Sequence, residues 1–347
     1  MVLALCPALS TIGGVQASGR VAWDAISAAS SNNGAVARLV MYGKGQTSSS
    51  RDVASARSRL TAIVLALQAR SAAHTVLVWH LDLVKLLPFV RRPGARVFIY
   101  LHGVEAFRGL TWITRRALFP GDVFLTNSDY TWRRFVAANP VFAEAPHLTV
   151  PLGLNRPAPA AAPVASPPAA LMVGRLRRDE DYKGHREVVA SWSTVRERVP
   201  GAELWIVGDG DLRPALERDA RDRGLAGSVR FLGEVSDSEK DDLLRRCRCF
   251  VMPSVGEGFG LVYVEAMRAG RPCLVSTLDA GREVVNPPEA GLAVDPRRPD
   301  EVADALVRLL TPGPEWDGWS EAGRVRYASR YTQEHFERRL MDALNLA

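Results

Sequence analysis

Cysteine is scarce in this chain of 347 residues, and its pattern fits neither a disulfide framework nor a metal site. Three of the four cysteines fall in apolar runs, so we expect buried free thiols and a reducing compartment. A zinc site would need a second pair or a histidine close by, and neither follows the one close pair. The four residues are Cys6, Cys247, Cys249 and Cys273.

The chain also lacks an apolar run long enough to cross a membrane. A long apolar run, residues 60–69, stops at Arg70, whereas a membrane-spanning helix needs about 20 apolar residues. Residues 1–7 have no basic residue ahead of their short apolar run, which is typical of a first β-strand and not of a signal peptide. We therefore expect a cytoplasmic protein.

Neither sign of charge dominates the sequence. Lys and Arg number 44, Asp and Glu number 38, and the net charge is +6. The chain is 47% hydrophobic and 24% charged, which is ordinary for a globular protein. The small excess of positive charge does not indicate nucleic-acid binding, but it permits contact with diphosphates or anionic lipid headgroups.

Short apolar runs alternate with helical stretches on both sides of a proline- and alanine-rich segment, residues 156–169. This alternation predicts parallel sheets built from βαβ units. We expect an N-terminal Rossmann-like domain over 1–155, a linker over 156–169, a second such domain over 170–324, and an amphipathic helix over 325–346. The expected strands lie at 76–79, 97–101, 123–126, 147–150, 170–173, 203–207, 229–232, 249–252 and 272–276.

A glycine-rich segment precedes a short helix, which is predicted over 261–269 and ends at Gly270. Glycines let the backbone approach a ligand closely. The start of a helix offers free N–H groups and the positive end of a dipole, which suits a phosphate. We therefore assign this segment to binding of a nucleotide diphosphate; its candidate residues are Gly258, Phe259, Gly260, Leu261 and Val262.

Two glutamates, Glu257 and Glu265, stand eight positions apart on either side of this helix start. Glu265 lies just over one turn into the helix, where its carboxylate can accept hydrogen bonds from two ribose hydroxyls. Glu257 can face another part of the same ligand. The spacing alone is common, and a loop glutamate and a solvated helix glutamate would explain it equally well.

The complete string of residues 254–272 resembles the E-x7-E signature of retaining glycosyltransferases with the GT-B fold, in particular the large family 4. The resemblance implies two Rossmann-like domains facing across a cleft, a C-terminal helix that crosses back to the first domain, and a nucleotide-sugar co-substrate. It implies that Glu265 binds the ribose and that Glu257 holds sugar hydroxyls and favours positive charge at the anomeric carbon. It also implies that the leaving phosphate takes the acceptor's proton on the face where the acceptor attacks, so no enzyme nucleophile is needed.

Other elements of the second domain extend this resemblance. Arg175, in Val-Gly-Arg-Leu, and Lys183, in Lys-Gly, match the family's cations that stabilise the leaving diphosphate. Gly208 lies in a segment that resembles the one lining the nucleotide pocket. Val235 follows a Phe-Leu-Gly element whose backbone usually meets the base. The two cations could also be ordinary solvated loop residues, and the glycine could be purely structural.

In the first domain the resemblance is looser. His102 and Glu105 lie in a His-Gly-x-Glu element after a predicted strand, and the family's histidine touches the transferred sugar. Ser128 starts an Asn-Ser-x-x-Thr turn that predicts a helix N-cap on the acceptor side. Gly13 and Gly14 resemble the family's Gly-Gly-Val loop, which faces donor and acceptor, although a simple turn before a helix is as good an interpretation.

Two D-x-D strings, at 179–181 and 209–211, match the metal-binding motif of the other glycosyltransferase fold. This pattern is very permissive. Arg175, Lys183 and the helix start already offer the diphosphate its compensating charge. We therefore expect no metal site and no bound cofactor beyond the nucleotide-sugar co-substrate.

The acceptor is a hypothesis: a saccharide or a lipid-linked saccharide. Arginine pairs interleaved with aromatic residues in the first domain could rest on an anionic membrane surface, although solvated arginines and core aromatics would also explain them. The residues are Arg91, Arg92, Arg115, Arg116, Arg133 and Arg134 with Phe89, Trp112, Phe119 and Trp132. An inverting transferase or epimerase of the same fold, and a non-catalytic sugar-nucleotide-binding subunit, are the alternatives.

Overall fold

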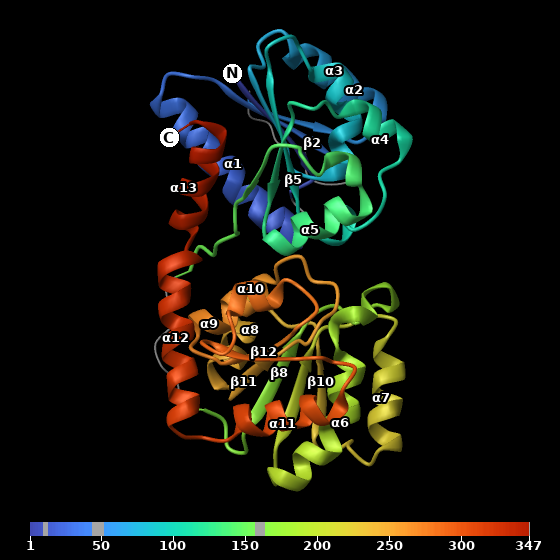
Figure 1. Ribbon diagram of the computed structural model, residues 1–347, viewed down its shortest axis with the longest axis vertical. Helices are drawn as coiled ribbons and strands as arrows, with labels where there is room; N and C mark the ends of the chain where they lie inside the picture. The colour runs from blue at the N-terminus through green and yellow to red at the C-terminus, as the bar shows by residue number, and fades with distance from the viewer. Residues whose placement is uncertain (10–12, 44–51, 157–163, 347) are drawn as a thin grey trace. The chain divides into compact units, whose positions relative to one another are not determined.

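The computed structural model describes residues 1–9, 13–43, 52–156 and 164–346. The chain forms two compact units: residues 1–153 with 333–347, and residues 154–332. Each unit is built on one parallel β-sheet with helices packed against it (Figure 1). The predicted α/β fold of two Rossmann-like domains is confirmed.

The sheet of unit 1 has seven strands in the order β3-β2-β1-β4-β5-β6-β7. Reversal of strand order beside β1 is the doubly wound arrangement, which places ligands at the carboxyl ends of the strands. The strands are β1 (Val2–Pro7), β2 (Ala37–Tyr42), β3 (Val53–Ala56), β4 (Thr75–Val78), β5 (Arg96–Leu101), β6 (Val123–Thr126) and β7 (His147–Thr149).

The helices of unit 1 include one from the far end of the chain, which packs against α1. They are α1 (Gly14–Asn32), α2 (Arg59–Arg70), α3 (Leu87–Val90), α4 (Trp112–Ala117), α5 (Asp129–Ala138) and α13 (Gln333–Leu344), with 3₁₀ turns η1 (Leu81–Leu86), η2 (Val104–Ala106) and η3 (Pro140–Phe142). Phe336 of α13 is buried and packs edge-on against the Trp79 ring, with centroids 6.3 Å apart. The last helix is therefore part of the core of unit 1.

Unit 2 repeats the arrangement with strand order β10-β9-β8-β11-β12-β13. The strands are β8 (Ala169–Val173), β9 (Glu203–Val207), β10 (Val229–Gly233), β11 (Cys249–Val251), β12 (Cys273–Ser276) and β13 (Gly291–Val294). The helices are α6 (His185–Arg198), α7 (Arg213–Asp222), α8 (Asp237–Arg246), α9 (Leu261–Arg268), α10 (Gly281–Val285), α11 (Pro299–Leu310) and α12 (Pro314–Arg330), with the 3₁₀ turn η4 (Arg178–Lys183).

Three features of the sequence interpretation change. The single helix expected over 325–346 is two helices, α12 and α13, separated at Tyr331 and Thr332. Those two residues leave the helix because Leu154 donates its amide to the Tyr331 carbonyl at 2.9 Å and forms a parallel bridge with Thr332. Strands β2, β3 and β13 were not predicted. Half of the expected linker, residues 157–163, lies outside the described residues, and Ala169 already belongs to β8.

All four cysteines are buried and free, as predicted. None of the described helices combines the length and apolar character that a membrane span requires.

We predict that Phe336→Ala lowers the free energy of unfolding by about 3–5 kcal/mol, because it empties a buried aromatic site in the core of unit 1. Urea unfolding measures this loss. Leu60→Ala, at a residue that is 77% exposed, is the control and is expected to change stability by less than about 0.5 kcal/mol. An equal effect of the two substitutions would show that α13 does not contribute to the core.

Candidate functional site

Two cations meet at one buried carboxylate beyond the carboxyl end of β8. Lys183 Nζ lies 2.5 Å from Glu180 Oε2, and Arg175 Nη2 pairs with Glu180 Oε1. Glu180 and Lys183 are buried, whereas the Arg175 side chain is 66% exposed. The structure thus brings the two predicted cations together. The residue that joins them, Glu180, was noticed in the sequence only as the middle of a D-x-D string.

Backbone contacts hold this loop against the loop after β11. The Val255 amide donates to the Tyr182 carbonyl at 2.9 Å. Gly184 has φ of +85°, and a Cβ there would lie 2.8 Å from the Pro253 carbonyl oxygen. Only glycine suits both the conformation and the space. The glycine after Lys183 is therefore required by the close packing of the two loops that carry Lys183 and Glu257.

Glu257 lies in the loop between β11 and α9 with a partly buried side chain. Burial raises the pKa of its carboxyl, and the nearby Glu180 carboxylate adds to the rise, while Lys183 and Arg175 counteract it. These four residues act on one another electrostatically, so they form one site. A carboxylate and two cations at one sheet edge can hold a sugar hydroxyl and a diphosphate side by side.

Asp279, between β12 and α10, holds the loop that carries Glu257 through hydrogen bonds to backbone amides. It is fully buried and accepts the amide N–H groups of Gly281 at 2.9 Å and Glu257 at 3.2 Å. Burial, reinforced by the charge of Glu257, raises the pKa of Asp279 to about 8. Sequence reasoning did not single out this residue.

The start of α9 is open, as the sequence predicted. Gly260 precedes the helix with φ of +81°, and a Cβ there would lie 2.5 Å from the Tyr263 ring. No side chain caps this end, so the amides of Leu261 and Val262 have no intrahelical acceptor. Phe259 is buried and packs edge-on against Tyr331, with centroids 5.8 Å apart; only its main chain can serve a ligand.

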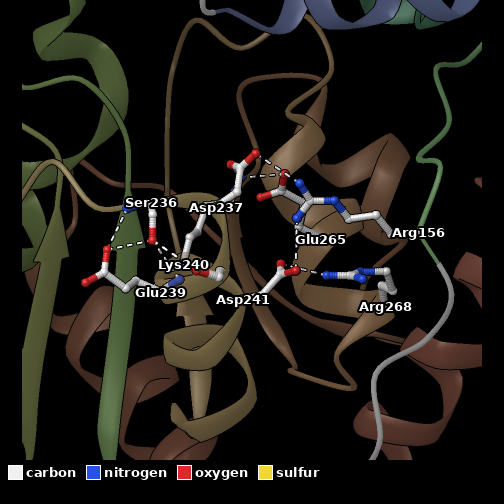
Figure 2. A network of polar contacts seen from close by, with 9 residues as sticks. Arg156, Ser236, Asp237, Glu239, Lys240, Asp241, Glu265 and Arg268 are labelled. Atoms are coloured by element: carbon white, nitrogen blue, oxygen red, sulfur yellow. Dashed lines mark hydrogen bonds and ion pairs between the residues drawn. The ribbon is translucent and has the colours of Figure 1, made fainter.

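Glu265 of α9 pairs with a lysine that sequence reasoning missed. Lys240 Nζ of α8 lies 2.8 Å from Glu265 Oε1, as Figure 2 shows. Glu265 Oε2 is buried without a hydrogen-bond partner. A buried carboxylate oxygen of this kind needs a donor, and a ligand hydroxyl can supply one.

The Lys240–Glu265 pair belongs to a longer chain of alternating charges (Figure 2). Lys240 also lies 3.5 Å from Asp237, and Arg156 bonds Asp237 at 3.0 Å. Asp241 joins Arg156, at 2.9 Å, to Arg268 of α9, at 2.7 Å. The network links α8 and α9 to the first residues of unit 2.

Gly208 and Val235 flank the same sheet edge. Gly208 has φ of +128°, and a Cβ there would lie 1.9 Å from the Gly174 carbonyl oxygen, so close packing of two strand ends requires this glycine. Its amide donates to the Gly233 carbonyl at 2.8 Å. Val235 lines a surface pocket with Leu232 at the start of α8. The structural role of Gly208 is thus explained without a ligand.

The D-x-D carboxylates serve local structure. Asp209 pairs with Arg213 at 3.0 Å and Asp179 with Arg177 at 2.9 Å. Asp211 accepts the Arg178 amide at 3.0 Å. Within the described part of the chain, no cluster of three or more histidine, cysteine or acidic residues is placed to hold a metal ion.

In unit 1, His102 follows β5 with its ring held in place. Its Nε2 lies 2.6 Å from the Trp79 carbonyl, and Asn127 donates to its main-chain oxygen at 2.6 Å. Burial lowers the pKa of His102 to about 4, although Glu105 opposes the shift. At neutral pH the ring is therefore uncharged. Because Nε2 faces a carbonyl it carries the proton, and Nδ1 is left as an acceptor.

The other predicted residues of unit 1 have local partners. Glu105 accepts the amides of His102 at 2.6 Å and Gly103 at 3.3 Å. Ser128 is buried and caps α5 by accepting the Thr131 amide at 3.1 Å, which confirms the predicted N-cap. Gly13 and Gly14 stand at the start of α1, which no side chain caps.

Comparison with known proteins decides the family. The family described as "Glycosyl transferases group 1" matches residues 167–312. A GDP-mannose-dependent alpha-(1-6)-phosphatidylinositol monomannoside mannosyltransferase of Mycobacterium tuberculosis is 32% identical over 285 residues, which cover 76% of this chain and 73% of the relative. The chain belongs to this glycosyltransferase family.

A second relative and a solved structure agree with the assignment. A phosphatidyl-myo-inositol mannosyltransferase of Mycolicibacterium smegmatis is 39% identical over 160 residues, which cover 46% of this chain and 39% of the relative. The structure of Anabaena HepE in complex with UDP covers 100% of both chains with a TM-score of 0.78 at 15% identity, a likeness of fold. The chain is a glycosyltransferase of the GT-B fold.

We predict that Asp279 makes the stability of this glycosyltransferase fall as pH rises. Its folded-state pKa, about 8, lies above the ordinary 3.8, so the folded protein holds the proton more tightly than the unfolded chain. This contribution is complete below about pH 4 and is lost progressively towards pH 8, at no more than about 1.4 kcal/mol per pH unit.

Urea unfolding of wild type and Asp279→Asn from pH 4 to 8 measures this contribution. The variant is expected to show a flatter pH profile, because its amide does not titrate. Asp219→Asn, at a partly exposed site on α7, is the control and should keep the wild-type slope. A wild-type slope in Asp279→Asn would contradict the assigned pKa.

Proposed function

We propose that this glycosyltransferase is retaining and that it moves a hexose of mannose or glucose type from a nucleotide-diphosphate sugar to an acceptor hydroxyl. The observation that carries the proposal is the grouping of Arg175, Lys183 and Glu257 around Glu180. The names of the relatives, with GDP-mannose and phosphatidylinositol mannosides, favour a mannose donor and synthesis of a glycolipid or polysaccharide.

The diphosphate would take the place beside the two cations and the open start of α9. Lys183 and Arg175 would leave Glu180 in part to bind its oxygens, and the amides of Leu261 and Val262 would add further donors. Once the donor is bound, these groups are in position, so they stabilise the charge that grows on the leaving diphosphate without further reorganisation. On this proposal the reaction needs no metal ion.

Glu265 would bind the ribose. Its Oε2 is buried and without a donor, while Lys240 holds Oε1 and compensates the charge. Two ribose hydroxyls donate to one carboxylate in such an arrangement. The pocket beside Val235, at the start of α8, would take the base.

Glu257 would hold hydroxyls of the transferred hexose and favour positive charge at the anomeric carbon. In the retaining reaction the bond from that carbon to the diphosphate oxygen breaks, the acceptor oxygen attacks the same face, and its proton passes to the departing phosphate. His102, neutral and with Nδ1 as an acceptor, would orient a sugar hydroxyl. No protein nucleophile takes part.

We predict that Glu257→Gln and Lys183→Ala each lower kcat by about 100- to 1000-fold, because each removes a preorganised charge from the transition state. Turnover of GDP-mannose, measured with a mannoside acceptor, checks this, and circular dichroism checks folding. Glu217→Gln, on the outer helix α7, is the matched control. Full activity of either variant would contradict the assigned roles, and an inverted product anomer would contradict retention.

We further propose that unit 1 rests on a membrane that holds a lipid-linked acceptor. Trp112, Ile113 and Phe119 are 71%, 51% and 51% exposed, and Arg115 and Arg116 follow on α4. Exposed aromatic and aliphatic side chains beside arginines suit an anionic lipid surface. Two residues named from the sequence do not belong to this surface, since Trp132 is buried and the Arg91 side chain, only 14% exposed, pairs with Asp122 at 2.6 Å.

We predict that the protein floats with phosphatidylglycerol vesicles at low salt and that the double variant Arg115→Gln, Arg116→Gln loses at least half of this binding. The physical reason is the attraction of each arginine near the surface to anionic lipid, about 1 kcal/mol. Arg196→Gln in unit 2 and phosphatidylcholine vesicles are the controls. Absence of flotation by the wild type would remove the membrane proposal and leave the transferase assignment intact.

A further inference from the structure

The turn between α9 and β12 buries a guanidinium, and the described residues supply no acceptor for two of its nitrogen atoms. Arg271 is 3% exposed, and its Nε and Nη1 are both buried without a hydrogen-bond partner. A buried charge of this kind is costly unless an opposite charge or several acceptors surround it. Arg271 has no part in the reaction proposed above.

The charged neighbours of Arg271 are also positive. Burial is the main cause that lowers the pKa of Arg271, and Arg324 and Arg248 lower it further. Cys247 acts in the opposite direction, but burial raises the pKa of its thiol to about 12, so it carries no charge at neutral pH. Arg248 Nε is likewise buried without a partner. Three guanidinium groups thus gather here, and among the described residues no carboxylate forms an ion pair with Arg271 or Arg248.

An aromatic ring provides part of the compensation. The Trp316 ring of α12 lies 5.8 Å from the Arg271 guanidinium and 5.5 Å from that of Arg248. Trp316 uses its own Nε1 to donate to the Arg248 carbonyl at 3.0 Å. A π face attracts cations but forms no hydrogen bond with their remaining N–H groups. The unsatisfied donors therefore remain.

Arg271 and Arg324 line a surface pocket of about 330 Å³ together with Trp316 and Ser320. Two carboxylates, Asp317 and Glu321, also line it. Both belong to exposed residues of α12, and Glu321 lies 4.0 Å from Arg324. Neither is paired with Arg271 in the described part of the chain. The buried cation of the pocket is thus Arg271, and the two acidic residues lie towards solvent.

This pocket is separate from the donor site. Arg248 and Arg271 precede β11 and β12, whereas Glu257 and Asp279 follow the same two strands. Because the strands are parallel, the first group lies at the amino ends of the strands of unit 2 and the second group at their carboxyl ends. An anion bound at Arg271 would not be the diphosphate of the donor.

We propose that the pocket between α12 and the turn before β12 binds a phosphate group, which Arg271 and Arg324 hold. A phosphate oxygen accepts the forked N–H groups of arginine better than any neutral acceptor does. The bound group joins α12 to the turn that ends α9. Free phosphate compounds and lipid headgroups share this chemistry.

Thermal unfolding with inorganic phosphate tests the site, in a buffer without other multivalent anions. We expect 10 mM phosphate to raise the Tm of the wild type by about 2–4 °C. Lys183→Ala, which weakens the donor site, should keep this rise. Arg271→Gln should lose it, Arg324→Gln should show less than half, and Arg230→Gln, on the exposed edge strand β10, should behave as wild type.

The outcomes separate the two sites. A rise that disappears in Lys183→Ala but persists in Arg271→Gln would place the phosphate in the donor site and overturn the proposal, as would no rise in the wild type. If Arg271→Gln does not fold, the comparison of Arg324→Gln with Arg230→Gln decides in its place.

Vesicles identify the source of the phosphate group. Co-sedimentation with phosphatidylglycerol that falls at least twofold in Arg271→Gln would assign the site to a lipid headgroup. Unchanged co-sedimentation, with the thermal shift lost, would assign it to a free phosphate compound. Either result supports a phosphate site at Arg271.

Discussion

The arrangement of the donor site depends on one buried carboxylate, Glu180. Lys183 and Arg175 carry like charges, and without Glu180 between them they would repel each other and turn outward. With it, both cations remain at the end of β8 before any ligand arrives. Burial is the main cause of the raised pKa of Glu257, and the same charge adds to the rise, so one residue influences both the position of the cations and the proton affinity of the neighbouring acid.

A bound diphosphate could replace Glu180 as the partner of the two cations. A carboxylate shared by two cations in a partly buried site is well compensated, but a diphosphate offers more charge and more acceptor oxygens than one carboxylate. On the proposed function, binding would therefore exchange one set of ion pairs for another instead of desolvating bare charges. Glycines at 184 and 208 permit the close backbone contacts that hold these loops together.

Much of the fold could be predicted because its signals are local. Residues 203–207 and 123–126 are strands with the predicted bounds, since continuous β-branched and aromatic runs need no partner to be recognised. β3, with the sequence Val-Ala-Ser-Ala, lacks such a run. The helix over 325–346 was wrong because the contact that interrupts it comes from Leu154, about 180 residues earlier in the chain.

The candidate site shows the same division. Glu257, Lys183 and the start of α9 belong to continuous strings, so sequence reasoning could find them. Lys240 and Asp279 could not be found, because each matters through a partner on another element, 25 and 22 residues away. Their importance is a property of the folded sheet edge and leaves no mark on the local pattern.

The membership of α13 in unit 1 has a consequence for biosynthesis. Unit 1 cannot complete its core until α13, which follows unit 2 in the chain, has left the ribosome, because Phe336 packs against Trp79. Unit 2, residues 154–332, is continuous and can fold while synthesis proceeds. Unit 1 therefore starts before unit 2 in the chain but completes its core after it, and a chain that stops short of α13 leaves Trp79 without its Phe336 contact.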